Sequence, residues 1–162
     1  NIDFTVDLKN YDQQIDLYWA NIKDRVMKLF THGQITKGHI NYDSDTGRVQ
    51  VSDGNLQYCV DLHQYDFVGC SLRGEFRHCD IFRCDVNGSD IEDCNFYQSS
   101  QINSSKVKSS YVHQSCRLYD CYVFGDGMLK GEMKSGIFRE GRYDKKLAKF
   151  DDKVEKILYK EV

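Results

Sequence analysis

The sequence predicts a mainly β fold: a parallel β-helix of about four coils, capped by one helix at each end. Three observations lead to this prediction. An apolar residue returns about every fifth position from Leu72 to Tyr143, a small residue stands two positions before most of these, and both terminal segments contain apolar residues at helical spacing. A period of five fits neither an α-helix nor an exposed strand. It is typical of a chain that winds repeatedly around one interior.

The repeat can be arranged into vertical columns. Its apolar positions are Leu72, Phe76, Ile81, Val86, Ile91, Phe96, Ile102, Val107, Val112, Leu118, Val123, Met128, Met133, Phe138 and Tyr143. Grouping them in fours cancels the occasional one-residue slips and places Phe76, Phe96, Leu118 and Phe138 in one column. The expected coil is therefore square, with about twenty residues stacked at the inter-strand spacing of about 4.8 Å.

Residues 79–98 carry a recognisable motif. The four units Cys79–Arg83, Cys84–Gly88, Ser89–Asp93 and Cys94–Gln98 each read small residue, Asp or Asn, apolar residue, then two freer positions. This pattern resembles the pentapeptide-repeat family over about residues 70–143. The resemblance implies a right-handed quadrilateral β-helix with the first and third positions inward, and it implies a fold rather than a reaction.

The N-terminal third, residues 1–55, is expected to contain a strand, a helix and a hairpin. Residues 1–9 alternate apolar and polar, which predicts a short strand. From Tyr11 to Thr31 apolar residues recur at three and four, with Asp12 as a plausible cap and Gly33 as a stop. Residues 34–52 read as a hairpin with a polar turn at 43–47, and an Asp-rich turn is favoured there over a calcium loop.

The β-helix is expected over residues 56–144, beginning with an irregular coil, and a second helix over 145–162. Leu147, Phe150, Val154, Ile157 and Leu158 have helical spacing in this Lys-rich tail. The string Gly125-Asp126-Gly127 is expected to be a bulged corner.

Composition limits the function. A net charge of −3 gives no strong field for binding nucleic acid or an anionic membrane, and no apolar run approaches membrane-spanning length. Six of the seven cysteines fall on the small inward position, so they are expected to be reduced core residues in a reducing, cytoplasmic compartment, with Cys94 and Cys116 as column neighbours.

No catalytic, cofactor or metal site is predicted. The histidines have no metal spacing, and the cysteines nearest to them point inward. Asp80, Asp85 and Asp90 should lie on successive sides of a coil and diverge, so they cannot act as paired carboxylates.

Outward aromatic residues are the unusual feature. The candidate interface residues are Phe82, Tyr97, Tyr111, Tyr119, Tyr122, Phe124, Arg77 and Arg139. Square coils would stack Tyr97 with Tyr119 in the column of Arg77 and Arg139, and Phe82 with Phe124 in the next. Aromatic residues beside arginine are enriched at protein interfaces. The alternative is that terminal helices cover this side.

These observations favour a non-enzymatic protein-interaction or scaffold module that binds a protein partner or a second copy of itself. One alternative, drawn from the family resemblance, is a DNA-mimic inhibitor of a type II topoisomerase, which requires a continuous acidic face. Another is a carbohydrate-binding β-helix that stacks sugars on its aromatic residues.

Overall fold

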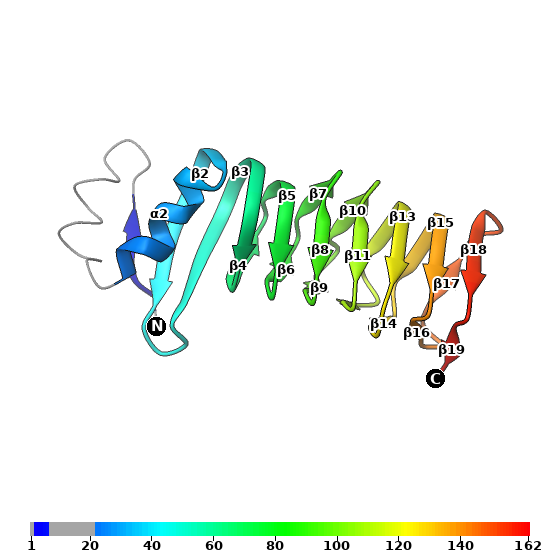
Figure 1. Ribbon diagram of the computed structural model, residues 1–162. Helices are drawn as coiled ribbons and strands as arrows, with labels where there is room; N and C mark the ends of the chain where they lie inside the picture. Colours follow the sequence, from blue (N-terminus) through cyan, green and yellow to red (C-terminus); the bar gives the residue numbers. More distant parts are fainter. Residues whose placement is uncertain (1, 7–21) are drawn as a thin grey trace.

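The computed structural model describes residues 2–6 and 22–162, and these form a mainly β, elongated solenoid (Figure 1). The N-terminal elements are β1 (Ile2–Val6), α2 (Lys23–Thr31), β2 (Gln34–Asp43) and β3 (Arg48–His63). The strands that follow are β4 (Tyr65–Val68), β5 (Ser71–Arg77), β6 (Asp80–Phe82), β7 (Asp85–Asn87), β8 (Asp90–Glu92), β9 (Asn95–Tyr97), β10 (Gln101–Asn103), β11 (Lys106–Lys108), β12 (Tyr111–Val112), β13 (Arg117–Phe124), β14 (Met128–Leu129), β15 (Glu132–Arg139), β16 (Arg142–Tyr143), β17 (Lys149–Phe150), β18 (Val154–Ile157) and β19 (Lys160–Glu161).

The N-terminal strand and hairpin are confirmed. Strands β1 and β2 pair antiparallel, and β2 pairs antiparallel with β3 around the turn at residues 43–47. The predicted helix is confirmed where it is described, as α2, whereas Tyr11, Asp12 and the rest of residues 7–21 lie outside the described part. Val26 and Leu29 of α2 are fully buried against β2 and β3, at the N-terminal end of the solenoid (Figure 1).

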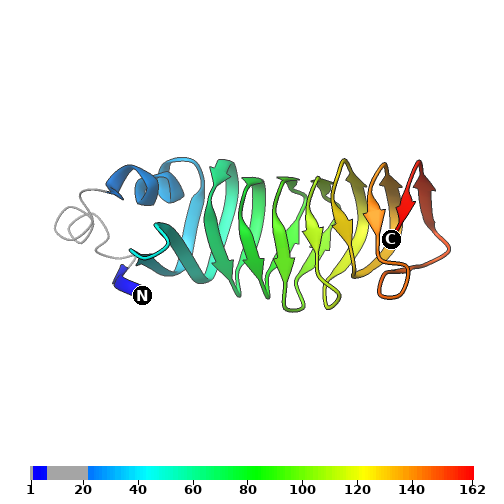
Figure 2. The same cartoon turned by 90° about the horizontal axis from the view of Figure 1, so that it is seen from below.

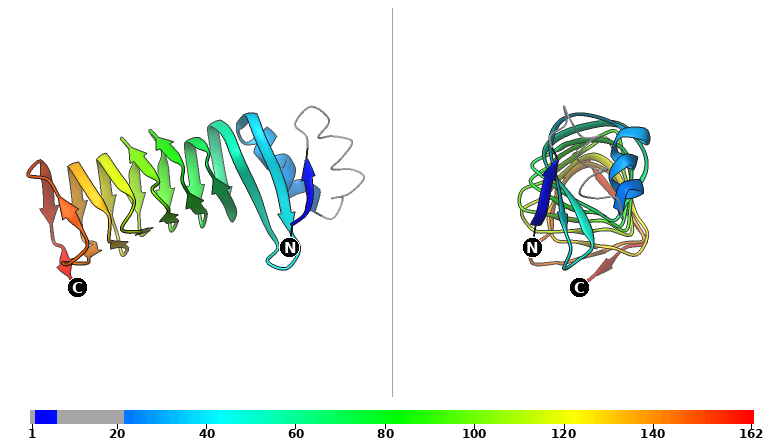
Figure 3. Two further views of the ribbon diagram at one scale, coloured as in Figure 1. Left: turned by 180° about the vertical axis from the view of Figure 1, so that it is seen from behind. Right: turned by 90° about the vertical axis from the view of Figure 1, so that its left-hand side faces the viewer.

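From β3 onward the strands pair in parallel and build about seven turns (Figure 2). Phe67 pairs with Ile81, Ile81 with Phe96 and Phe96 with Val112. These steps are 14, 15 and 16 residues, so each turn contains three five-residue units. The view along the axis shows the turns superposed around one interior (Figure 3).

The expected square coil of about twenty residues is therefore wrong, and with it the count of four coils. Each turn has three sides, which we name after their inward columns. Column A contains Val51, Phe67, Ile81, Phe96, Val112, Leu129 and Tyr143. Column B contains Leu56, Leu72, Val86, Ile102, Leu118, Met133 and Phe150. Column C contains Leu62, Phe76, Ile91, Val107, Val123 and Phe138.

Phe76, Phe96, Leu118 and Phe138 consequently do not form a column: Phe76 and Phe138 belong to column C, Phe96 to A and Leu118 to B. All four are nevertheless fully or almost fully buried. The physical reason is that any large apolar side chain fills an inward position, so resemblance between residues does not reveal how many units close a turn.

The corners fix the geometry of the turn. Residues that precede a small position adopt left-handed φ values, for example +52° at Arg83, +51° at Asp93 and +50° at Ser104. The N–H of each donates to a carbonyl one turn further along, such as Asp93 to Lys108 at 2.9 Å. Regular hydrogen bonding thereby offsets the cost of about 1–3 kcal/mol that such a backbone conformation carries.

The inward position of the cysteines is confirmed, since all seven are buried with free thiols. Their column neighbours differ from the expectation, however. The N–H of Cys70 donates to Sγ of Cys84 and that of Cys79 to Sγ of Cys94, whereas Cys116 follows Ser100 by one turn, since the N–H of Arg117 donates to the Ser100 carbonyl. The corner at residues 125–127 is bulged as expected, and its extra residue makes Leu129 the buried side chain in place of Met128.

The predicted C-terminal helix over 145–162 does not form. Strands β17, β18 and β19 instead continue the solenoid, because the free edges of β15 and β16 supply backbone partners. The carboxylate of Asp144 accepts the N–H groups of Lys146 and Leu147, and its carbonyl accepts that of Ala148, so a single turn forms before β17 begins. In this last turn Lys156 pairs with Phe138, and its ammonium group lies 4.9 Å from the Phe150 ring.

Candidate interaction surface

Each three-residue strand presents two outward side chains, one before and one after its inward residue. Every side of the solenoid therefore carries two outward rows, which we call its first row and its second row. The register places Phe82, Tyr97 and Tyr111 on side A, Tyr119 on side B, and Tyr122, Phe124, Arg77 and Arg139 on side C. The expected stacking of Tyr97 with Tyr119 and of Phe82 with Phe124 is thus wrong, because each pair is split between two sides.

Side A carries an aromatic row. The rings of Phe82 and Tyr97 stack with centroids 5.0 Å apart and an interplanar angle of 19°. Tyr97 lies 6.2 Å from Tyr111 and 6.0 Å from His113. Phe82, Tyr97 and His113 belong to the second row of side A, and Tyr111 lies beside them in the first row. We call these four residues together the aromatic row. All four side chains are half-buried. Lys130 lies at the C-terminal end of the aromatic row, with Nζ 5.3 Å from the centre of the Tyr111 ring.

The sequence reasoning missed His113, a member of the aromatic row, and the neighbouring Lys130. They follow Tyr97 by 16 and then 17 residues, the length of one turn, so a three-unit period would have identified both. Nδ1 of His113 is buried and has no hydrogen-bond partner among the described residues. Burial raises the pKa of Tyr97, which keeps its phenol neutral.

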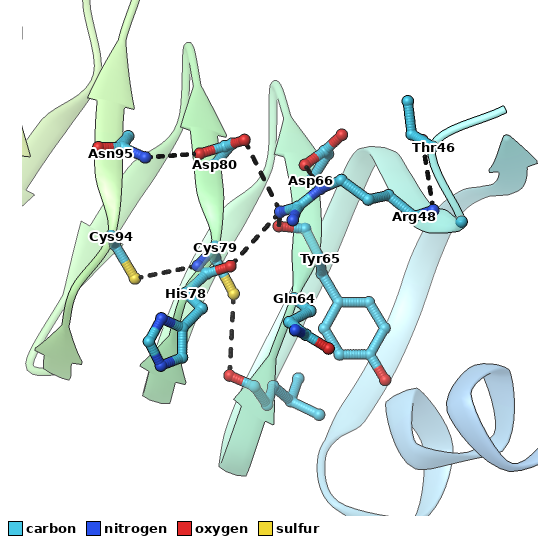
Figure 4. A network of polar contacts seen from close by, with 12 residues as sticks. Thr46, Arg48, Gln64, Tyr65, Asp66, His78, Cys79, Asp80, Cys94 and Asn95 are labelled. Atoms are coloured by element: carbon cyan, nitrogen blue, oxygen red, sulfur yellow. Dashed lines mark hydrogen bonds and ion pairs between the residues drawn. The ribbon is translucent and has the colours of Figure 1, made fainter.

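A network of polar contacts precedes the aromatic row on side A (Figure 4). Nε of Arg48 lies 2.6 Å from a carboxylate oxygen of Asp66, and its Nη2 lies 3.7 Å from Asp80. The amide of Asn95 donates to Asp80 at 2.9 Å. Burial raises the pKa of Asp66 and Arg48 opposes that effect, while the contacts of the guanidinium with Asp66 and Asp80 link three turns.

Side C has a groove between its two rows, with a volume of about 390 Å³. We call it the side C groove. Its walls are Asp61, Glu75, Arg77, Asp90, Glu92, Lys106, Lys108 and Phe124, and its floor is formed by Phe76 and Ile91. The rings of Tyr122 and Phe124 stack at 4.6 Å beyond the lysines. In the first row acidic side chains therefore precede Lys106 and Tyr122 along the axis, whereas in the second row Arg77 precedes Glu92.

Side B is mainly polar. The side-chain amide of Asn103 donates to Asn87 at 2.9 Å, and that of Gln101 donates to Asn103 at 3.3 Å. Tyr119 lies one turn beyond Asn103, and Nζ of Lys134 is 5.9 Å from the centre of its ring. Tyr119 is the one candidate interface residue on this side, and it has no stacked aromatic neighbour among the described residues.

The described part of the chain does not cover these aromatic residues with a helix. Helix α2 lies at the N-terminal end, where it contacts β2, β3 and Tyr65 of β4, and residues 145–162 form short strands and turns rather than a helix (Figures 1 and 3). The alternative of a side buried beneath terminal helices therefore finds no support among the residues that the structure describes.

Groups suited to catalysis or metal binding are dispersed. Asp80, Asp85 and Asp90 stand before inward residues of sides A, B and C and diverge as expected. Within residues 22–162, no three His, Cys, Asp or Glu side chains gather as a metal site. Burial raises the pKa of the Cys59 thiol to about 12 and of the Cys121 thiol to about 11, which disfavours the reactive thiolate.

Comparison with known proteins returned no match to a family model, to a curated protein or to a solved structure. No helix in the described part of the chain has the length and apolar character needed to cross a membrane.

Proposed function

We propose that this chain is a non-enzymatic protein-interaction or scaffold module, a pentapeptide-like solenoid that presents its sides to other protein chains. The observation that carries the proposal is the aromatic row on side A. Four half-buried rings, Phe82, Tyr97, Tyr111 and His113, lie together across adjacent turns, and no described element covers them. Such clusters, with a cation beside them, are enriched in the energetically dominant parts of protein interfaces.

The solenoid suits this role physically. Nearly every side of every turn is hydrogen-bonded to the turns before and after it, so the outward rows are held at fixed spacing along the axis. A preformed surface reduces the entropy that is lost when a partner binds.

The two alternatives receive less support. A DNA mimic requires a continuous acidic stripe, but on side C the run Asp61, Glu75 and Asp90 is followed by Lys106. A sugar-binding platform requires open ring faces. Phe82 and Tyr97 cover one another, as do Tyr122 and Phe124, so their edges rather than their shared faces point to solvent.

We also infer that the chain acts in a reducing compartment such as the cytoplasm. Seven cysteines without a disulfide are compatible with that environment. The test is whether the thiols remain unpaired when the protein is isolated from its source under alkylating conditions.

The aromatic row is tested with the double substitution Tyr97→Ser/Tyr111→Ser. Proteins retained from source-cell extract by the wild-type chain but not by this variant would be identified, purified and titrated against both. We expect at least a tenfold loss of affinity for the variant. Tyr119→Ser on side B is the matched control and should bind like the wild type. Equal binding by all three chains would overturn the role of the aromatic row.

A further inference from the structure

Side C carries a pattern of charge that is self-complementary. Its first row reads Glu75, Asp90, Lys106 and Tyr122, and its second row reads Arg77, Glu92, Lys108 and Phe124. In both rows the sign changes from negative to positive between β8 and β11, which are neighbouring strands (Figure 1). A surface of this kind matches itself when one copy is turned end over end, because the two acidic residues of β8 then meet the two lysines of β11.

We propose that two copies of the chain associate through side C with their axes antiparallel. The two-fold axis would run along the strands, midway between β8 and β11. This rotation keeps first row opposite first row, so Asp90 faces Lys106 of the second copy and Glu92 faces its Lys108. One turn further out, Arg77 faces Phe124 of the second copy. The inference deepens the proposed function, and rests on it, by naming a second copy as one partner.

The outer positions also match. The Arg77 guanidinium would lie against the Phe124 ring of the second copy, a favoured cation–aromatic contact. Glu75 would meet the phenol of Tyr122, which can donate a hydrogen bond to the carboxylate. Tyr122, Phe124 and Arg77 were among the residues that the sequence marked as an interface, and the three-sided register brings them to one side.

A parallel arrangement does not have this match. With the two-fold axis along the solenoid, first row would lie opposite second row at the same height. Asp90 would then face Glu92 of the second copy, and Lys106 would face Lys108. Like charges held opposite one another are unfavourable, so the charge pattern selects the antiparallel pair.

The charged groups of β8 and β11 are available for such contacts, whereas Arg77 already forms an ion pair with Asp61, with its Nε 2.9 Å from a carboxylate oxygen. Among the described residues, neither Asp90 nor Lys106 forms an ion pair, although they lie on adjacent strands. Lys108 and Glu92 are 3.6 Å apart, and their side chains are 50% and 46% exposed. Their ion pair can therefore be exchanged for one across the interface at little cost.

The size of the contact predicts a weak dimer. Four turns at a spacing of about 4.8 Å and a side about 16 Å wide give roughly 300 Å² on each copy. A total of about 600 Å² is below the usual size of stable interfaces, which indicates a transient complex. Because the contacts are largely ionic and at the surface, association should weaken with salt. We expect a dissociation constant in the micromolar range at low ionic strength.

Charge reversal tests the proposal by sedimentation velocity at low salt. One double variant, Lys106→Glu/Lys108→Glu, makes the two basic positions acidic. The other, Asp90→Lys/Glu92→Lys, makes the two acidic positions basic. Each variant alone places like charges across the interface, so its dimerisation should weaken at least tenfold. An equimolar mixture restores opposite charges at every position and should form a heterodimer tighter than the wild-type pair. The control Lys145→Glu/Lys146→Glu has the same change in net charge as Lys106→Glu/Lys108→Glu but lies away from side C, and it should dimerise like the wild type.

The outcomes separate this inference from the proposed function. A wild-type chain that stays monomeric up to 200 µM at low salt overturns the antiparallel dimer but leaves the aromatic row to be tested with its own variants. A dimer that withstands both charge reversals would show self-association through another surface, which contradicts side C while supporting an interaction role. Circular dichroism spectra and melting temperatures would establish that each variant is folded.

Discussion

The backbone N–H of Cys84 donates a hydrogen bond of 3.2 Å to the hydroxyl oxygen of Ser100, one turn further along the solenoid. The same contact recurs inside the core: the N–H of Ser89 donates to Ser105 Oγ at 3.0 Å, and that of Cys94 to Ser110 Oγ at 3.1 Å. A small residue at this position therefore does more than fill space. Its sulfur or oxygen accepts the buried N–H of the preceding turn, which explains why either Cys or Ser can occupy this position.

Replacing the acceptor should destabilise the fold. In Ser100→Ala the N–H of Cys84 stays buried without a partner, which should lower the free energy of unfolding by about 1–3 kcal/mol. Ser100→Cys is the matched control, because a thiol accepts the equivalent N–H of Cys70 at Cys84. It should lose less than half as much in urea unfolding. Equal losses for the two variants would contradict a hydrogen-bonding role.

Gly136 is required by close approach of two turns. It adopts a φ of +102°, and a methyl group there would overlap the carbonyl of Cys121. We expect Gly136→Ala to cost about 3 kcal/mol or more, since neither backbone can move without disturbing the ladder. Gly47→Ala shares a positive φ but meets no atom within 4 Å, so it should cost about 1 kcal/mol. Thermal unfolding of both variants checks the difference, and similar melting temperatures would refute it.

Arg48→Ala should unfold more easily at neutral pH than at acidic pH. Removing the guanidinium leaves Asp66, whose pKa is already raised by burial, without its opposing charge. A carboxyl with a raised pKa in the folded state stabilises the protein below its unfolded pKa, and that contribution is lost as pH rises. The expected loss is about 1–3 kcal/mol at pH 7 and smaller near pH 4.

The double variant Arg48→Ala/Asp66→Asn is the control for this network. An amide needs no compensating cation, so the double variant should be more stable than Arg48→Ala alone at pH 7. Chemical unfolding at both pH values measures the comparison. A loss that is the same at pH 4 and pH 7 would indicate that Arg48 acts through packing rather than charge.

The fold should weaken in alkaline solution. Burial raises the pKa of the Cys59 thiol from 9.0 to about 12 and that of Cys121 to about 11. Both raised values stabilise the folded state below pH 9, and this contribution falls as the unfolded thiols ionise above it. At pH 10.5 the loss should be about 2 kcal/mol for each thiol.

Guanidinium unfolding with reductant at pH 7.5, 9.5 and 10.5 measures this loss. Cys121→Ser removes one of the two titrating thiols, so its free energy of unfolding should fall less between pH 7.5 and pH 10.5 than that of the wild type. Each protein is compared with its own value at pH 7.5. A free energy of unfolding that stays constant up to pH 10.5 would show that these thiols do not resist ionisation in the folded protein.

The five-residue period of the sequence determined which side chains point inward. Phe76, Phe96 and Leu118 are buried as predicted, and the cysteines line the interior beside them. This much is local, since a small residue and a large apolar residue at fixed spacing define one strand and one corner. The N-terminal hairpin is also a local feature, because its two strands and the turn between them are adjacent in the sequence.

Only the tertiary structure decided how many units close a turn, and therefore which outward residues meet. That number depends on the left-handed corners at residues such as Arg83 and Asp93, which bend the chain without any fixed residue type. Three units per turn bring Tyr97 to His113 and split it from Tyr119. The same holds for residues 145–162: their apolar spacing suits a helix, but the free edges of β15 and β16 provide hydrogen-bond partners that an isolated segment lacks, and strands form instead.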